Sequence, residues 1–437
     1  MVTLGSPRRG HVVDQMRPRL LLALDVNALT PGAAIPEGTP RTRSPWAKPW
    51  LDFSDSDAGF QMLEMFVVLN AAKYPEYFQE LEGMAAGSGV SMQEIMLLNF
   101  RQELSTAGGL ARSPPDCSDQ LLHGSTNGHA LLGHNEDNSG DLLNASYFIQ
   151  ADLGGRQWTA FTYAGELSST AFGFNDAGVA FTLNALFPTN VTVPGIGRNF
   201  VSRDLLQAAG VLPAHGVVKP PDWASSYEDG LRRITTARHS AGHNYNLLAL
   251  PAASLVQYRS GSGPGCTGEG RMELCSSADA EARLRMATVE VGPGGVHDDL
   301  EVLKGHSYFH ANSYQRLGVE QMHEESSLHR LKRAAEIAVS APASLLSSLF
   351  LSPALKPALH MHQVPQGADS ILKLLGDTED AAYPLYCRGE NGIYTLATAL
   401  FDLQAATMNV YTGNPKAQRL QASFKLPQPP RLGFTTS

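Results

Sequence analysis

The order of apolar patterns along the chain predicts an α+β protein. Helical spacing dominates the stretch from Phe60 to Phe100, whereas short apolar runs separated by Gly and Asn turns dominate after Cys117. Helices in runs beside strands in runs are typical of α+β layer folds, and not of alternating α/β folds. The 437 residues are enough for one large or two ordinary domains.

Composition narrows the class of protein. The chain is 43% hydrophobic and 17% charged, as in an ordinary globular protein. Its net charge of −9, with no basic cluster, argues against a nucleic-acid partner. No run of about 18 apolar residues indicates a membrane span, and the apolar run Leu20–Leu24 is too short for a signal peptide. We therefore expect a cytoplasmic protein that does not associate with membranes.

The first 116 residues divide into an arm and a helical segment. Residues 1–48 are rich in Pro, Arg, Thr and Gly and show no periodicity, which predicts a disordered arm. Residues 49–116 contain helical patterns and end in the linker Ser113–Pro115. The remaining residues, 117–437, are the expected catalytic segment.

Two helices are predicted in this segment. The apolar face of the first has four members at helical spacing: Met62, Met65, Phe66 and Leu69. Pro75 should end that helix near Tyr74, because the α conformation is disfavoured before a proline. Ser91 and Glu94 form a capping box for the second helix. We expect both helices to serve core packing.

The region after Cys117 alternates between strand and helix patterns. Predicted strands are Tyr147–Ala151, Trp158–Tyr163, Val179–Leu183, Asn244–Leu250 and a closing hairpin of Ile393–Leu403 with Met408–Tyr411. Predicted helices are Phe200–Ala209, Tyr227–His239, Ser327–Val339 and Ala341–Leu351. The segment 306–314 is expected to cross the functional site of the protein.

A β-hairpin follows the first cysteine. Gln120–His123 and His129–His134 have strand character, and Ser125–Gly128 has turn chemistry. Because a hairpin folds its ends back together, Cys117 should meet the segment Asn135–Asp137 in space.

A thiol in that position needs a base, since it is mostly protonated at neutral pH. One solution makes the cysteine the first residue of a chain, so that its own α-amine is the base. An α-amine with a pKa near 7.8 is neutral several hundredfold more often than a lysine with a pKa of about 10.4. Cys117 is internal, so this solution requires cleavage of the Asp116–Cys117 bond.

These residues resemble a known family. The pieces that carry the likeness are Cys117-Ser118-Asp119, Leu131–Asp137, Tyr163–Leu167, Phe174–Val179, His310–Asn312 and Tyr386–Arg388. They are similar to the acyl-coenzyme A:6-aminopenicillanic acid acyltransferase family of N-terminal nucleophile hydrolases. The resemblance implies a four-layer αββα sandwich, self-cleavage before Cys117, two fragments that stay together as a heterodimer, and no cofactor. The family commonly has glycine where this chain has Asp116.

The resemblance also implies roles for individual residues. Asp137 would orient the new α-amine, although Asn135 or Glu136 could be the nearer group. Asn184 and Asn312 would donate to the oxyanion, with Asn244 as a competitor for either role.

The resemblance implies two further roles, one for an arginine and one for residues that line the substrate. Arg388 would be an active-site arginine, with Arg330 as the alternative. His134, Asn135 and Tyr163 would line the substrate.

No metal is expected, because the histidines have no metal-like spacing. Cys266 and Cys275 could form a disulfide or remain free thiols.

The predicted function is that of a self-processing cysteine amide hydrolase acting on a small linear amide. For the nearest members of the family the implied substrates are N-β-alanyl amines, of the β-alanyl-dopamine or β-alanyl-histamine type. Two alternatives remain. One is an acyltransferase that moves an acyl group from a thioester to an amine; the other is an uncleaved relative that only binds small amides or partners.

Overall fold

The computed structural model describes most of the chain. The described residues are 2–4, 48–110, 117–124, 130–153, 156–168, 170–208, 223–250, 284–339, 360–361 and 367–427. Several predictions therefore concern residues outside this description: most of the arm 1–48, the linker Ser113–Pro115, Asp116, the turn Ser125–Gly128, Cys266, Cys275 and the helix Ala341–Leu351.

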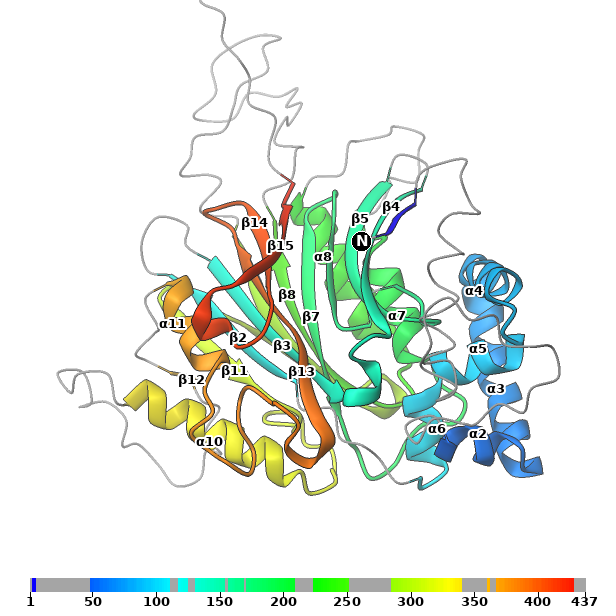
Figure 1. Ribbon diagram of the computed structural model, residues 1–437. Coiled ribbons are helices and arrows are strands. Elements are labelled where there is room, and N and C mark those ends of the chain that lie inside the picture. Colours follow the sequence, from blue (N-terminus) through cyan, green and yellow to red (C-terminus); the bar gives the residue numbers. More distant parts are fainter. Residues whose placement is uncertain are drawn as a thin grey trace, which may run out of the picture.

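Two β-sheets form the centre of the molecule (Figure 1). In spatial order the first sheet contains β1 (Val2–Leu4), β4 (Ser146–Leu153), β5 (Arg156–Tyr163), β6 (Phe172–Asn175), β7 (Val179–Leu186), β8 (Gly242–Ala249), β9 (Met286–Val291) and β10 (His297–Glu301). The second contains β12 (His360–Met361), β11 (His306–His310), β2 (Ser118–His123), β3 (Ala130–Ser139), β13 (Ile393–Asp402), β14 (Thr407–Tyr411) and β15 (Leu420–Lys425). Neighbouring strands pair antiparallel, except β1, which is parallel to β4.

Helices cover the outer face of each sheet (Figure 1). Those on the first sheet are α7 (Arg198–Leu205) and α8 (Trp223–Thr236), and α8 contacts β7 and β8. Those on the second are α10 (Glu325–Val339) and α11 (Ala368–Leu375); α10 contacts β11, and α11 contacts β2, β3 and β13. Because β2 also contacts β7, the sheets face each other and the layers run α, β, β, α. The predicted four-layer αββα sandwich is confirmed.

The helical segment lies beside this sandwich, next to α7 (Figure 1). It consists of α2 (Lys48–Ser54), α3 (Asp57–Lys73), α4 (Pro75–Ser88), α5 (Met92–Asn99) and α6 (Arg101–Ala107). As predicted, α3 stops just before Tyr74 and Pro75, and Ser91 and Glu94 form a complete capping box at the start of α5. One predicted core residue is wrong: the Met65 side chain is 45% exposed, because the buried face of α3 follows Leu63 and Phe66 instead.

Stacked aromatic rings attach the helical segment to α7. The Phe200 ring lies 5.1 Å from that of Phe100 and 5.4 Å from that of Phe78, measured between centroids. Phe66 stacks on Phe100 at 5.5 Å. All three rings of this Phe66–Phe100–Phe200 stack are fully buried, and such pairs stabilise beyond the area that they bury.

The predicted hairpin is present as β2 and β3, with β3 continuing through Asp137 to Ser139. The register pairs Ser118 with Asn135, which brings Cys117 and the Asn135–Asp137 segment together as predicted. The other predicted strands match β4, β5, β7, β8, β13 and β14. None of the described helices is both long and apolar enough to cross a bilayer.

Candidate functional site

Cys117 stands at the start of β2, a strand with neighbours on both sides. Strand β11 pairs with one edge of β2 and β3 with the other. Only 3% of Cys117 is exposed. Its thiol donates a hydrogen bond to Glu136 Oε2 at 3.3 Å, across the β2–β3 pair. The hairpin thus gives the thiol a carboxylate as its hydrogen-bond acceptor.

The Glu136 carboxylate is a shared acceptor. Besides the thiol, it accepts a hydrogen bond from His134 Nε2 at 3.1 Å and one from the Tyr163 hydroxyl. Only 4% of Glu136 is exposed. All three donors belong to side chains that can release a proton, so this carboxylate can exchange protons with each of them.

His134 links this carboxylate to a second one. Its Nδ1 lies 2.9 Å from Asp119 Oδ1, which also accepts a hydrogen bond from the Thr182 hydroxyl at 2.5 Å. Burial disfavours the charged imidazolium, but Asp119 and Glu136 together raise the pKa of His134 to about 10. His134 is therefore positively charged at neutral pH.

Burial raises the pKa of the Cys117 thiol well above its usual value. The negative charges of Glu136 and Asp137 raise it further, and the backbone N–H of Asp137, which hydrogen-bonds the sulfur, opposes them. The thiol is therefore protonated at neutral pH. It needs a group that takes its proton before it can attack a carbonyl carbon.

Asn135 and Asp137 alternate with His134 and Glu136 along β3. The Asn135 side chain donates to the carbonyls of Leu375 at 2.8 Å and Leu385 at 2.7 Å, and it accepts from Thr398 at 2.7 Å. The Asn135 side chain thus makes its contacts on the side of the sheet that α11 covers. Asp137 is fully buried, and its charge helps burial to raise the pKa of Tyr386.

Asn184 faces the space between the sheets. Its Oδ1 accepts from Asn244 Nδ2 at 3.1 Å and from Asn246 Nδ2 at 3.4 Å. Its Nδ2 is fully buried and has no acceptor among the residues that the structure describes. This amide can therefore donate to a developing oxyanion. Asn244, its predicted competitor, already uses its Nδ2 in these contacts.

Arg330 joins Asn312 to the nucleophile. Its guanidinium, fully buried, donates to the Cys117 carbonyl at 2.6 Å, to Ser118 Oγ at 3.0 Å and to Asn312 Oδ1 at 2.9 Å. Asn312 Nδ2 donates to the Ala185 carbonyl at 2.9 Å. The structure therefore brings Asn312 into the network around Cys117 through Arg330.

The Arg388 side chain is largely exposed to solvent. It is 61% exposed, and its Nε lies 3.6 Å from Glu390 Oε1. Of the two arginines considered from the sequence, Arg330 contacts the Cys117 backbone, whereas an active-site role for Arg388 stays a prediction.

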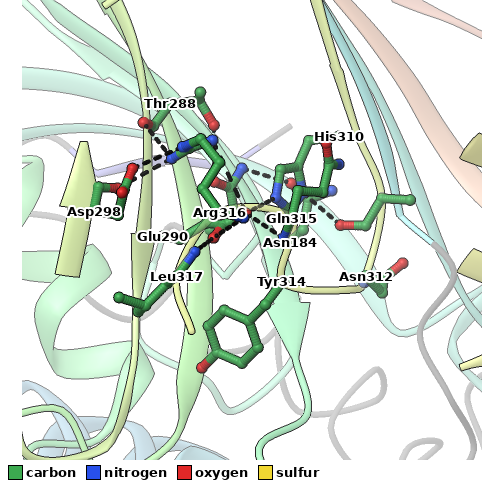
Figure 2. Close-up of polar contacts among 12 residues, drawn as sticks. Asn184, Thr288, Glu290, Asp298, His310, Asn312, Tyr314, Gln315, Arg316 and Leu317 are labelled. Atoms are coloured by element: carbon green, nitrogen blue, oxygen red, sulfur yellow. Dashed lines mark hydrogen bonds and ion pairs between the residues drawn. The ribbon is translucent and has the colours of Figure 1, made fainter. Parts of the chain in front are cut away.

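Another buried carboxylate, that of Glu290 on β9, was not predicted (Figure 2). It pairs with His310 Nε2 at 3.1 Å. It also accepts hydrogen bonds from the backbone N–H groups of Gln315 at 2.8 Å, Arg316 at 3.0 Å and Leu317 at 2.7 Å. Burial opposes ionisation, but His310, Arg316 and these N–H groups lower the pKa of Glu290 to about 2. Glu290 thus anchors the loop that follows Asn312.

A layer of hydrogen-bonded polar side chains runs between the sheets from the Glu136 cluster to Thr288, two residues before Glu290 on β9. Asn246 Nδ2 donates to the Thr182 hydroxyl at 3.1 Å, and Thr288 donates to Asn244 Oδ1 at 2.8 Å. The sequence signal is polar residues two positions apart in neighbouring strands: Asp119, His134, Glu136, Thr182, Asn184, Asn244, Asn246, Thr288 and Glu290. Residues two apart in a strand share one face, so this pattern could have located the layer.

Three side chains in this cluster carry atoms that ligate metals. Cys117 Sγ and one atom each of His134 and Glu136 lie within 4.8 Å of one another. The expectation of no metal site considered spacing along the chain, whereas these three residues meet because two strands pair.

Comparison with known proteins agrees with the likeness seen in the motifs. The model of the family "Acyl-coenzyme A:6-aminopenicillanic acid acyl-transferase" matches residues 124–228. The beta-alanyl-dopamine/carcinine hydrolase of Drosophila melanogaster is 22% identical over 361 residues, which cover 78% of this chain and 77% of that protein. The chain is thus similar to this family over residues 124–228 and to this hydrolase over most of its length. The part of the chain that the family model matches includes β3, the strand that carries His134, Glu136 and Asp137.

Two solved structures share lower similarity with the chain. An N-acylethanolamine-hydrolyzing acid amidase ortholog from Caenorhabditis elegans is 10% identical with a TM-score of 0.36, covering 71% of this chain and all of that one. A mutant of the conjugated bile acid hydrolase from Clostridium perfringens is 9% identical with a TM-score of 0.29, covering 73% of this chain and 99% of that one. Neither alignment bears on the activity of this chain.

Proposed function

We propose that this chain is a self-processing cysteine amide hydrolase with Cys117 as its nucleophile. The observation that carries the proposal is the buried contact of 3.3 Å between the Cys117 thiol and Glu136. The match to the family model supports it, as does the similarity to a hydrolase whose name specifies amides of β-alanine. A thiol beside a proton acceptor is the arrangement that acyl transfer to sulfur requires.

The first step would be cleavage of the chain itself. Glu136 takes the thiol proton, and Cys117 Sγ attacks the carbonyl carbon of Asp116. The new C–S bond forms as the Asp116–Cys117 C–N bond breaks, and the departing nitrogen receives the proton. Water then hydrolyses the thioester, which leaves a carboxylate on Asp116 and a free thiol and α-amine on Cys117. Because the intact chain has no α-amine at this position, Glu136 supplies the base that the first step needs.

The matured site would then act on external amides. The α-amine of Cys117 becomes a second base, and Asp137, whose backbone already contacts the sulfur, orients it. Asn184, which has a free donor among the described residues, stabilises the oxyanion. Asn312 would be the second donor, as the sequence predicts, and Arg330 holds it next to the backbone of Cys117.

The two fragments would remain associated after cleavage. The Phe66–Phe100–Phe200 stack has two rings in the smaller fragment and one in the larger. Buried polar contacts cross the same boundary: Asn99 donates to the Gly165 carbonyl at 2.8 Å, and Arg101 pairs with Glu166 at 2.6 Å. Separation would expose this core to water, which is unfavourable.

The substrate class follows from the Drosophila relative, whose name specifies β-alanyl-dopamine and carcinine. We propose an N-β-alanyl amine as the substrate of this chain. Of the three residues predicted to line it, His134 and Tyr163 belong to the Glu136 cluster. Asn135 contacts the α11 side instead.

Acyl transfer is the second candidate, because the family model carries the name of an acyltransferase. The acyl-enzyme on Cys117 would then react with an amine in place of water. A comparison of product formation with and without added amine distinguishes the two reactions. The third possibility, an uncleaved binding protein, would need neither the Cys117 thiol nor Glu136.

The deciding experiment is the intact mass of purified protein, with Cys117→Ala and Cys387→Ala beside the wild type. We expect two fragments in the wild type, one beginning at Cys117, and the same two in Cys387→Ala, a buried thiol at a different position. Cys117→Ala should stay whole. Hydrolysis of β-alanyl-dopamine and β-alanyl-histamine is then measured on all three. A wild type that stays whole and hydrolyses neither amide would overturn the proposal.

A further inference from the structure

The cluster around Cys117 has the composition of a metal site as well as that of a nucleophile. A thiolate, an imidazole and a carboxylate are the donor types that zinc prefers in proteins. Among the described residues, Cys117 Sγ, a ring nitrogen of His134 and a carboxylate oxygen of Glu136 lie within 4.8 Å of one another. We propose that these three residues bind a zinc ion, and that the bound ion blocks the nucleophile reversibly.

The distances suit one tetrahedral ion. Bonds of 2.0 to 2.3 Å place neighbouring donor atoms about 3.3 to 3.6 Å apart around zinc. Glu136 Oε2 already lies 3.3 Å from Cys117 Sγ and 3.1 Å from His134 Nε2. Two edges of the ligand triangle are therefore within a few tenths of an ångström of the required length.

The surroundings of the donors are also those of a metal site. Zinc-binding histidines usually contact a carboxylate through their second ring nitrogen, which fixes the orientation of the ring. Here Asp119 Oδ1 lies 2.9 Å from His134 Nδ1, so that Nε2 faces Glu136. The Asp119 carboxylate is itself held by Thr182, and the Glu136 carboxylate by Tyr163. The ligands are thus oriented before any ion arrives.

Charge favours a cation at this position. Asp119, Glu136 and Asp137 are buried around the site, and their three carboxylates outnumber the guanidinium of Arg330 that contacts the Cys117 carbonyl. On binding, Zn–S and Zn–N bonds form, and the thiol proton and the proton on His134 Nε2 both leave to solvent. The electron pair with which the sulfur would attack a carbonyl carbon is then held in the Zn–S bond. The three donors are present whether or not the bond before Cys117 is cut.

Cadmium, which binds the same ligands, tests the site because a cadmium–thiolate bond absorbs in the ultraviolet. The chain has four cysteines, so replacing Cys266, Cys275 and Cys387 by serine leaves Cys117 as the single thiol. We expect this variant to develop the absorption with one equivalent of Cd²⁺ and to lose it when Zn²⁺ is added in excess. Adding Cys117→Ser should abolish the absorption.

Further variants test the ligand His134 and the Asp119 carboxylate that orients it. His134→Gln and Asp119→Asn should each weaken cadmium binding at least tenfold. His123→Gln is the matched control, since His123 is also buried in the second sheet but contacts the Val302 carbonyl instead. Glu136→Gln provides an independent test if His134→Gln does not fold, as judged by circular dichroism.

The outcomes are distinct. Absence of the absorption, or affinity that is equal in the His134→Gln, Glu136→Gln and His123→Gln variants, would overturn the metal site. If the site exists and the proposed hydrolase activity also holds, one equivalent of zinc should abolish that activity and a chelator should restore it. Because cadmium absorption requires no catalysis, failure of the metal site and failure of the proposed function remain separate results.

Discussion

Two Glu–His pairs lie between the sheets, and both have the same separation of 3.1 Å. Glu136 and His134 are two residues apart on β3, whereas Glu290 and His310 come from different sheets. The difference lies in the other partners. Glu136 contacts a thiol and a phenol, which can release protons, while Glu290 accepts from three backbone N–H groups, which cannot. The first pair therefore suits proton transfer, and the second fixes a loop.

This comparison shows that burial alone does not identify a functional carboxylate. Both glutamates are almost fully enclosed. What distinguishes them is whether the groups around each one can change protonation state during a reaction.

The largest expected effect comes from Glu136→Gln, which keeps the size of the side chain but removes its capacity to take a proton. We expect the rate of self-cleavage to fall by about 10²- to 10⁴-fold. The measurement is the intact mass of freshly purified protein as a function of time. Glu290→Gln is the matched control and should cleave at the wild-type rate. Cleavage of the Glu136→Gln variant within threefold of that rate would assign the base to another group.

Glu290→Gln should instead lower stability. Its new amide group would face backbone N–H donors and His310, so the variant loses charge-assisted hydrogen bonds that the interior cannot replace. We expect the free energy of unfolding to fall by about 3 kcal/mol, measured by urea denaturation. Glu320→Gln, at an exposed position, should change little. Equal stabilities for the two variants would contradict the anchoring role.

The stabilisation that each pair contributes should depend on pH in opposite directions. Glu290 has a folded-state pKa lowered to about 2, so its stabilisation is present above its ordinary pKa of 4.5 and is lost as the pH falls toward 2. His134 has a pKa raised to about 10, so its stabilisation is present below 6.5 and is lost as the pH rises through 10. The contributions of Glu290 and His134 are measured as the differences in unfolding free energy between the wild type and the Glu290→Gln and His134→Gln variants at several pH values. Differences from wild type that stay constant with pH would refute these assignments.

The smallest effect is expected from Arg388→Ala, because its exposed ion pair with Glu390 lies outside the buried layer. Stability should change by less than about 1 kcal/mol, and self-cleavage should be unaffected. Arg330→Gln is the contrasting variant, since it removes a donor from the Cys117 carbonyl, and should slow cleavage. A loss of cleavage in Arg388→Ala would instead support the active-site role that the sequence predicts.

The sequence was sufficient for features that depend on local patterns. Strand periodicity located β2 and β3, and turn chemistry implied the hairpin that brings Cys117 to the Asn135–Asp137 segment. The capping box at Ser91 and the helix end before Pro75 are equally local.

Features that depend on contacts between distant strands could not be predicted in the same way. Glu290 meets His310 and the loop after Asn312 only because two sheets pack face to face. Likewise, which of Glu136 and Asp137 contacts the sulfur depends on the register of β2 against β3, which the hairpin pattern leaves open by one residue. The exposure of Met65 reflects the tertiary placement of α3, which periodicity does not give.

The position of β2 in its sheet has a consequence for the behaviour of the cut chain. Ends of chains usually fray, and their amide hydrogens exchange quickly with solvent. The new end at Cys117 would begin a strand that is hydrogen-bonded on both edges and whose first carbonyl is held by Arg330. Amide hydrogens from Asp119 to Leu121 should therefore exchange as slowly as those of an interior strand. The terminus made by cleavage would therefore be as rigid as a strand within an uninterrupted chain. This rigidity would hold the nucleophile at one fixed place.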